Sequence, residues 1–191
     1  DFEVNEFLEE NMSMSLGSGL VTLLSLTNAY GMIVNGGKKI KPNLITSIYS
    51  KSGKKFSDNS IKVCKKCKIE VLNENTKLPV IQNNLKEVID PKIAYQITSM
   101  MEGVIKRGTG RKLRNLNLSL AGKTGTTNKN MDAWFLGFTS KLVIGVYVGF
   151  DEPKTLGKYE TGAKAALPIF KKFVQNIVKK KDALPFKIPK N

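Results

Sequence analysis

The sequence contains no histidine, and this absence removes several common arrangements for catalysis. Without an imidazole the chain cannot form a Ser-His-Asp or Cys-His nucleophile pair, nor a zinc site that uses histidine ligands. Any acid–base chemistry near neutral pH therefore falls to lysines or carboxylates.

Cysteine is nearly as scarce, because the only two cysteines are Cys64 and Cys67 of a single CxxC. No second pair completes a four-cysteine zinc site, and no βαβ pattern of the thioredoxin type surrounds the motif. We interpret the pair as structural, either a local disulfide or two free thiols in a turn; redox chemistry or metal capture is the alternative. No metal site and no cofactor are predicted.

Acidic residues are few, with 16 Asp and Glu against 31 Lys and Arg, so the net charge is +15. The lysines are spread along the chain instead of being gathered into one helix or tail. The charge is compatible with an anionic polymer, lipid head groups or nucleic acid nearby, and equally with a lysine-rich composition alone. The length of 191 residues and the 41% hydrophobic content fit one globular domain.

Long uninterrupted apolar runs are also missing. Residues 11–37 carry no charge, but small and polar residues such as Gly17, Gly19 and Thr22 interrupt them, so a core helix is expected there and not a membrane span. The chain begins at Asp1 without a basic segment or a cleavage signal, so any targeting or anchoring element is expected to lie outside it.

The hydrophobic periodicity predicts an α+β fold, an antiparallel sheet flanked by helices. Helices are expected over residues 22–35, from the Asp90-Pro91 cap to about residue 107, and over 163–178. The sheet strands are expected at residues 116–126, 133–138 and 142–150. A hairpin after residue 42, a surface insertion over 57–80 that carries the CxxC, and an extended tail over 179–191 complete the prediction.

Two sets of apolar residues are predicted to form the core. Trp134, Phe135 and Phe138 lie within strand patterns, where packing is more probable than base stacking. The last helix is expected to bury one face, formed by Ala166, Ile169, Phe170, Phe173 and Ile177.

Residues 121–127, Ala-Gly-Lys-Thr-Gly-Thr-Thr, carry a pattern suited to acyl transfer on a substrate that ends in a carboxylate. Lys123 supplies a positive charge, and Thr124 and Thr126 are two apart on a strand, so their hydroxyls point to the same side. Gly125 lets a substrate backbone approach, and the Thr126 amide can donate to a developing oxyanion. The alternative is an ordinary surface strand with a glycine bulge.

The same Lys-Thr-Gly belongs to the motif set of β-lactamases and penicillin-binding proteins. Over nearly its whole length the sequence resembles the class A, bifunctional penicillin-binding proteins, and we expect the chain to be the C-terminal part of their transpeptidase domain. The matching segments are Ser15-Leu16-Gly17-Ser18-Gly19, Asn28-Ala29-Tyr30, Asn35-Gly36-Gly37, Gly103-Val104, Gly108-Thr109-Gly110, Ala121 to Asn128, Asp132-Ala133-Trp134-Phe135 with Gly137, Val148-Gly149-Phe150-Asp151, Glu160-Thr161-Gly162 and Ala166-Leu167-Pro168-Ile169.

The resemblance implies a serine-type D-Ala-D-Ala transpeptidase of cell-wall synthesis, at the periplasmic face of the inner membrane, with peptidoglycan stem peptides as substrates and β-lactams as ligands. Lys123 is then the catalytic residue, which helps bind the carboxylate and tunes proton transfer. Thr124, Gly125 and Thr126 bind substrate, and the Thr126 N–H forms half of the oxyanion hole. A glycosyltransferase domain elsewhere in the protein is also implied.

Two strings mimic the family's remaining motifs, and we reject both. Ser52-Gly53-Lys54-Lys55 reads as S-x-x-K, but it lies in a polar turn, whereas the family's nucleophile begins a buried helix. Ser57-Asp58-Asn59 reads as S-x-N, yet both strings follow the Gly-Ser-Gly segment that they precede in the family. The true nucleophile is therefore expected upstream of Asp1, and the chain alone is expected not to acylate.

The high positive charge leaves one alternative of a different class, a non-catalytic basic module that binds nucleic acid or an anionic polymer. This alternative predicts affinity that falls steeply with salt. On the resemblance, no nucleic-acid partner is expected.

Overall fold

A computed structural model describes residues 2–5, 11–58, 63–65, 80–82, 85–179 and 184–189. The chain divides into two compact units, Asp1–Ile40 together with Glu87–Asn191, and Lys41–Lys86. An antiparallel bridge between Lys38 and Glu87 closes the first unit where the chain leaves and re-enters it. The predicted insertion over residues 57–80 falls within the second unit, and most of it lies outside the described residues.

A three-stranded antiparallel sheet forms the centre of the first unit, in the order β5 (Ala121–Thr126), β6 (Asp132–Phe138), β7 (Val143–Gly149). The strands are adjacent in sequence, and the short helix η3 (Asn128–Asn130) joins the first two. The prediction for the last two strands is confirmed. The first begins five residues later than predicted because the 3-10 helix η2 (Arg111–Leu116) occupies residue 116, and Asn117, with a φ of 52°, turns the chain out of it.

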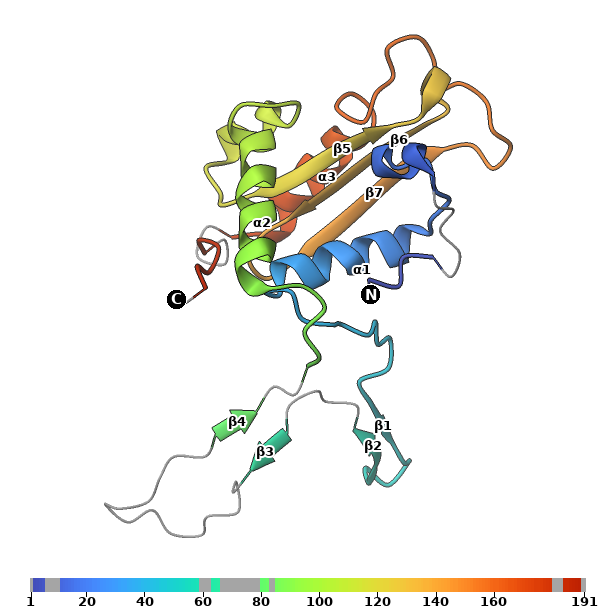
Figure 1. Ribbon diagram of the computed structural model, residues 1–191. Helices are drawn as coiled ribbons and strands as arrows, with labels where there is room; N and C mark the ends of the chain where they lie inside the picture. Colours follow the sequence, from blue (N-terminus) through green and yellow to red (C-terminus); the bar gives the residue numbers. More distant parts are fainter. Residues whose placement is uncertain are drawn as a thin grey trace. The chain divides into compact units, whose positions relative to one another are not determined.

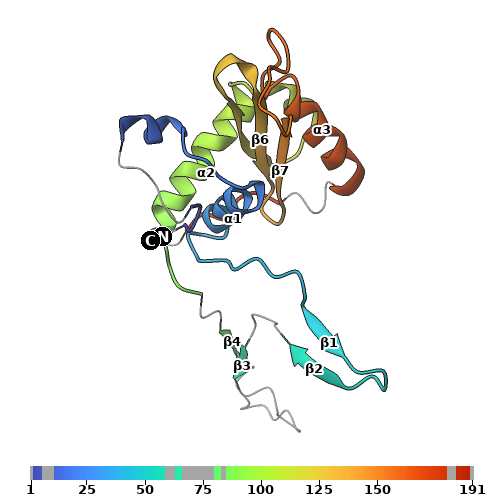
Figure 2. The ribbon, with the colours of Figure 1, turned by 90° about the vertical axis from the view of Figure 1, so that its right-hand side faces the viewer.

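Helices cover both faces of this sheet, which confirms the α+β prediction. They are α1 (Leu23–Val34), α2 (Pro91–Lys106) and α3 (Ala166–Ile177), and α1 follows the 3-10 helix η1 (Met12–Leu16). Figures 1 and 2 show α3 on one face of the sheet and α1 with α2 on the other. Helix α2 contacts β5, whereas α3 contacts β6 and β7.

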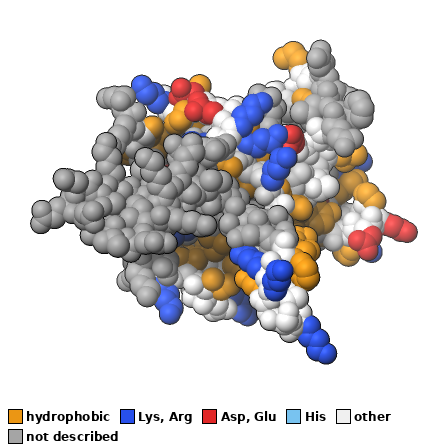
Figure 3. Space-filling view, turned by 90° about the horizontal axis from the view of Figure 1, so that it is seen from below, with side chains coloured by type: hydrophobic (Ala, Val, Ile, Leu, Met, Phe, Trp, Pro, Cys, Tyr) orange, Lys and Arg blue, Asp and Glu red, His pale blue; other side chains and the backbone are white. Residues whose placement is uncertain are grey.

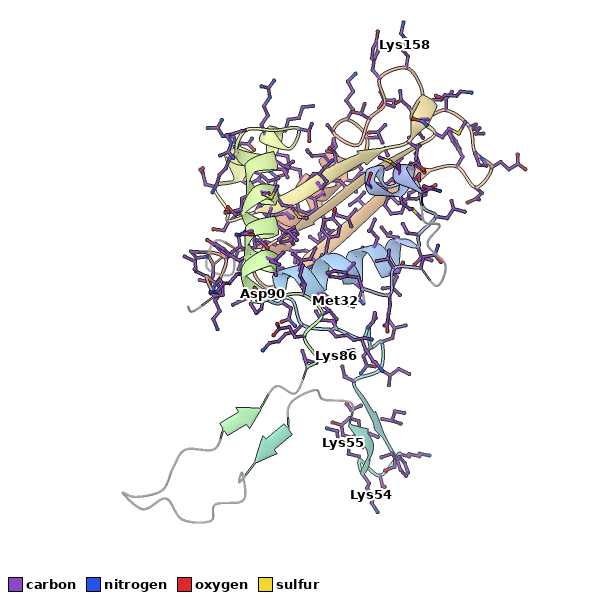
Figure 4. All side chains as sticks on the ribbon, viewed as in Figure 1. Met32, Lys54, Lys55, Lys86, Asp90 and Lys158 are labelled. Carbon is purple, nitrogen blue, oxygen red and sulfur yellow. The ribbon has the colours of Figure 1, made fainter. Side chains whose placement is uncertain are left out.

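The start of α2 is fixed by the cap that the sequence predicts. The Asp90 carboxylate accepts hydrogen bonds from the Lys92 N–H at 2.7 Å and the Ile93 N–H at 3.4 Å, and Pro91 occupies the first helical turn. Figure 4 shows Asp90 at this end of α2 and Met32 in α1, where its side chain is fully buried. The two helices contact each other.

The core lies between α3 and the sheet, but the buried face of α3 differs from the prediction. Ala166 and Phe170 are buried as expected. The ring of Phe170 packs against that of Phe135, with the two ring centroids 4.8 Å apart. Ile169, Phe173 and Ile177 are 52%, 44% and 53% exposed, so the prediction was wrong for these three. Each of the three lies one position from a residue whose side chain faces the sheet. Because neighbouring residues in a helix are separated by about 100° around its axis, these three side chains point away from β6 and β7.

The other two helices also bury less than their sequences suggest. In α1 the buried residues are Ala29, Gly31 and Met32, while Leu24 is 59% exposed. In α2, Met100 is 73% exposed. Within the described residues, none of the helices is long and apolar enough to cross a membrane.

A loop after β7 returns across the sheet and brings Gly162 against β5 and β6. A Cβ atom on Gly162 would lie 2.4 Å from the carbonyl oxygen of Trp134 and 2.5 Å from that of Gly125. Both are backbone atoms and cannot move aside cheaply. Glycine is therefore the residue that lets this loop lie directly on the strand pair.

The second unit contains two small antiparallel pairs, β1 (Ser47–Tyr49) with β2 (Lys55–Asp58) and β3 (Val63–Lys65) with β4 (Val80–Gln82). The first pair is the predicted hairpin. Cys64 lies on β3 opposite Ile81, and Cys67 lies outside the described residues.

On the face drawn in Figure 3, Lys and Arg side chains stand in several separate groups. Figure 4 shows Lys54 and Lys55 on the hairpin of the second unit, and Lys158 on a loop of the first. The described part of the C-terminal tail, residues 184–189, has no helix or strand.

The burial pattern of α3 makes a direct prediction about stability. Phe170→Ala should lower the free energy of unfolding by about 3–5 kcal/mol because it removes a fully buried ring. Phe173→Ala, one turn along and 44% exposed, should cost much less. Urea unfolding of both variants checks this, and equal losses would contradict the observed orientation of α3.

The close approach of Gly162 makes a second prediction. Gly162→Ala should destabilise the protein by about 1–3 kcal/mol because the new methyl group overlaps fixed backbone atoms. Gly103→Ala, inside α2, is the matched control: its methyl group would meet only the movable end of Arg107, and alanine favours a helix by about 0.5–1 kcal/mol. A thermal melt in which both variants lose stability equally would count against this packing.

Candidate active site

Strand β5 stands at the edge of the sheet, and its pairing with β6 determines which of its amides are used. Gly125 lies opposite Trp134 and Thr126 opposite Ala133, and one residue further along the Thr127 N–H donates to the Asp132 carbonyl at 3.3 Å. In an antiparallel pair, hydrogen-bonded and non-hydrogen-bonded positions alternate. Gly125 is therefore bonded to β6, while the N–H and C=O groups of Thr124 and Thr126 point away from it.

The position of Lys123 agrees with this alternation. Its side chain is exposed, and its Nζ donates a 2.7 Å hydrogen bond to the carbonyl oxygen of Thr124. That contact requires the Thr124 carbonyl to face the open edge. The ammonium group of Lys123 therefore stands at the unpaired edge of β5, beside the main chain of the next residue.

The Thr124 hydroxyl is fixed by a residue to which the sequence assigned no role. Thr109 Oγ1 lies 2.9 Å from Thr124 Oγ1. Thr109 follows the end of α2, whose contact with β5 brings the two hydroxyls together. The Gly108-Thr109-Gly110 segment was recognised only as part of the family resemblance, because a hydroxyl pair formed across the fold leaves no local sequence signal.

The Thr126 hydroxyl is fixed by the loop that carries Gly162. The Gly162 N–H donates to Thr126 Oγ1 at 3.0 Å. A hydroxyl that accepts this bond keeps its own proton available to donate. Glycine at position 162 permits both the close packing on β5 and this hydrogen bond. In the sequence, Gly162 was noted only as part of the family-matching segment Glu160-Thr161-Gly162.

The predicted site residues thus come together at the strand edge and not on one face. Alternation along β5 places the Thr124 and Thr126 side chains on one face and that of Lys123 on the other. Among the described residues, the side chains of Lys123, Thr124 and Thr126 form no hydrogen bond with one another. The cation, the two hydroxyls and the outward N–H of Thr126 all border the same open edge.

Aromatic residues support the strand from behind this edge. Trp134, opposite Gly125, packs edge-to-face on Tyr147 of β7 with ring centroids 4.8 Å apart. Phe135 and Phe138 are fully buried, as predicted, and are not available to stack on bases. In the described part of the chain, no three His, Cys, Asp or Glu residues cluster as a metal site requires.

The two rejected motif strings lie in the second unit, away from any helix start. Ser52 occupies the turn between β1 and β2, where its hydroxyl contacts that of Ser50 at 2.8 Å. Lys55 lies on β2 with its Nζ 5.9 Å from the centroid of the Tyr49 ring. Ser57 is on β2, and Asn59 lies outside the described residues. The turn agrees with the reason for which Ser52 was rejected.

Comparison with known proteins shows which family the sequence matches. The family model described as "Penicillin binding protein transpeptidase domain" matches residues 3–175. Penicillin-binding protein 1A of Rickettsia bellii is 42% identical over 189 residues, which is 98% of this chain and 24% of that protein. Penicillin-binding protein 1A of Neisseria meningitidis is 34% identical over 183 residues, 95% of this chain and 21% of that protein. The chain thus spans about a quarter of the length of these relatives.

Solved structures show the same fold. The crystal structure of penicillin-binding protein 1A from Haemophilus influenzae matches with a TM-score of 0.71 at 28% identity, covering 93% of this chain and 30% of that one. PonA1 from Mycobacterium tuberculosis matches with a TM-score of 0.73 at 22% identity, covering 95% of this chain and 44% of that one. The family match covers most of the chain, and the Lys-Thr-Gly edge strand lies within it. This chain belongs to the penicillin-binding protein transpeptidase domain family.

Proposed function

We propose that the intact protein is a serine-type peptidoglycan D-Ala-D-Ala transpeptidase, and that this chain supplies the strand against which the substrate peptide lies. The observation that carries the proposal is the unpaired edge of β5, which combines one ammonium group, two hydroxyls and an outward N–H. Membership of the transpeptidase family supports it.

Recognition of the substrate begins with its terminal carboxylate. Thr126 Oγ1 accepts from Gly162 and can donate its own proton to a carboxylate oxygen. The Thr124 hydroxyl is shared with Thr109, and that contact limits its rotation. Lys123, at the open edge, adds a positive charge that favours the anion. The terminal carboxylate of D-Ala-D-Ala, or that of a β-lactam, fits these three groups.

The acyl-transfer step uses the main chain of the same strand. A serine oxygen attacks the carbonyl carbon between the two D-alanines, and the carbonyl oxygen gains the negative charge. The N–H of Thr126 can stabilise that charge as one donor of an oxyanion hole. The C–N bond then breaks, the leaving amine takes a proton, and free D-alanine departs from the acyl-enzyme. An amine of a neighbouring stem peptide attacks the ester and completes the cross-link; water as acceptor would give a carboxypeptidase.

The nucleophile in this proposal comes from sequence outside the 191 residues. Ser52 lies in a hairpin turn and not at a helix start, so it lacks a lysine one turn below it to accept its proton. The partners are peptidoglycan stem peptides, β-lactams and the remainder of the transpeptidase domain, and no nucleic acid is expected. The place of action is the cell envelope, at the periplasmic face of the inner membrane, with the anchor and a glycosyltransferase domain elsewhere in the protein.

The proposed position of the nucleophile outside the 191 residues predicts how the protein reacts with penicillin. The 191-residue chain should show no covalent labelling by a fluorescent penicillin, because the strand edge alone has no nucleophile. A longer polypeptide from the same protein, extended upstream to include a helix-borne S-x-x-K, should be labelled. Gel fluorescence after denaturation measures both, with excess unlabelled penicillin as the control. Labelling of the short chain at Ser52 would contradict the assignment.

The oxyanion role predicts different effects from two substitutions at one position. In the longer polypeptide, Thr126→Ala removes the hydroxyl and keeps the N–H, whereas Thr126→Pro removes both. Proline is tolerated on an edge strand where the N–H points outward. Because one oxyanion donor is worth about 10²–10³ in rate, the proline variant should acylate slower than the alanine variant by about that factor. Equal acylation rates in a stopped-flow assay would exclude the Thr126 amide as a donor.

A further inference from the structure

An open cleft of about 800 Å³ lies between η2 and the first turns of α3, apart from the edge of β5. Of its two apolar lining residues, Pro168 is exposed, whereas Leu167 is 1% exposed and belongs to the core. The remaining lining is polar and of one charge sign: Arg111, Lys112, Arg114, Asn115, Asn117 and Lys171. None of the residues assigned to acyl transfer lines this cleft.

In the part of the chain that the structure describes, no acidic side chain pairs with the four cations of the cleft. No Asp or Glu is among the residues that line the cleft. Among the described residues, the ion pairs join Lys39 to Glu3 and Lys106 to Glu102, and neither involves a cation of the cleft. Like charges held close together repel each other and raise the positive potential of a concave surface. An anion that enters the cleft relieves this repulsion.

The fold brings these cations together from two separate elements. Arg111, Lys112 and Arg114 stand on η2, whose position is fixed by the fully buried side chain of Leu113. Lys171 lies on α3, four residues after Leu167 and so on the same side of the helix. Leu167 and Pro168 belong to the first turn of this twelve-residue helix, so its positive dipole end also borders the cleft.

We propose that this cleft binds a ligand through closely spaced phosphate groups, such as a diphosphate. Arginine guanidinium groups bind phosphate oxygens bidentately, and the side-chain amides of Asn115 and Asn117 add neutral donors. Four cations exceed what one phosphate requires, and the volume is in the range of small-molecule sites. The diphosphate can come from a soluble molecule or from a lipid head group, because both present the same oxygens.

The test is titration calorimetry of the 191-residue chain with inorganic pyrophosphate at about 0.15 M ionic strength, where long-range attraction is screened. The unmodified chain should bind saturably. Arg111→Gln with Arg114→Gln should weaken binding by about 10- to 100-fold, because two charge-assisted contacts are lost. Both arginines are exposed, so the variant should keep its thermal unfolding midpoint. If it does not fold, Lys112→Gln tests the same cleft.

The matched control removes the same charge elsewhere. Lys154→Gln with Lys158→Gln changes two exposed lysines of the loop after β7, where Figure 4 shows Lys158. Its affinity for pyrophosphate should equal that of the unmodified chain. Equal affinity in all three proteins would show that binding does not depend on the cations of this cleft, and it would overturn the proposal. The absence of saturable binding would overturn it as well.

Two further ligands identify the source of the phosphates. Phosphatidylcholine vesicles that contain a long-chain polyprenyl diphosphate should displace pyrophosphate if the site accepts a lipid head group, and should fail to displace it if only soluble diphosphates reach the cleft; both results support the site. A single-stranded oligonucleotide that binds more tightly than pyrophosphate, and loses its affinity in the arginine variant, would overturn the assignment and indicate nucleic acid. Because β5 is unchanged in every variant, none of these outcomes bears on the proposed acyl transfer.

Discussion

Among the described residues β5 pairs with a single strand, β6, and the candidate site depends on this constraint. Its odd-numbered residues from Ala121 to Gly125 bond to β6, and the alternation turns the amides of Thr124 and Thr126 outward. A buried peptide group without a partner would be costly, so such an edge persists only where another chain or water can meet it. The proposed peptide substrate would meet the same requirement by pairing with β5, in the manner of strand addition.

The rest of the first unit holds this edge in one conformation. Helix α3 supports the sheet from one face through Phe170, and α1 and α2 lie on the other. Two segments distant in sequence then fix the two hydroxyls, Thr109 after α2 and Gly162 after β7. The site therefore consists of one local motif and two contacts formed only when the sheet and helices have assembled. Binding residues held in this way lose little side-chain freedom when a ligand arrives.

The sequence predicted the local features well because their causes are local. The Asp90 cap and the strand alternation from Ala133 to Gly149 are set by neighbouring residues, and both were placed within a few positions. The buried face of α3 was mispredicted because Ile169, Phe173 and Ile177 are as apolar as the residues that face the sheet, and only packing chooses between them. Thr109 and Gly162 escaped assignment for the same reason. The start of β5 was placed too early because Asn117 in a left-handed conformation is rarely signalled by sequence.

The open edge of β5 can be tested in the chain itself, without substrate, by amide hydrogen exchange measured with NMR. The Gly125 N–H, bonded to β6, should exchange slowly, whereas the Thr126 N–H next to it should exchange at a rate near that of an unprotected amide. Equal protection of the two amides would show that the Thr126 N–H already has a partner, and it would contradict the open edge on which the proposed substrate binding and oxyanion stabilisation both rest.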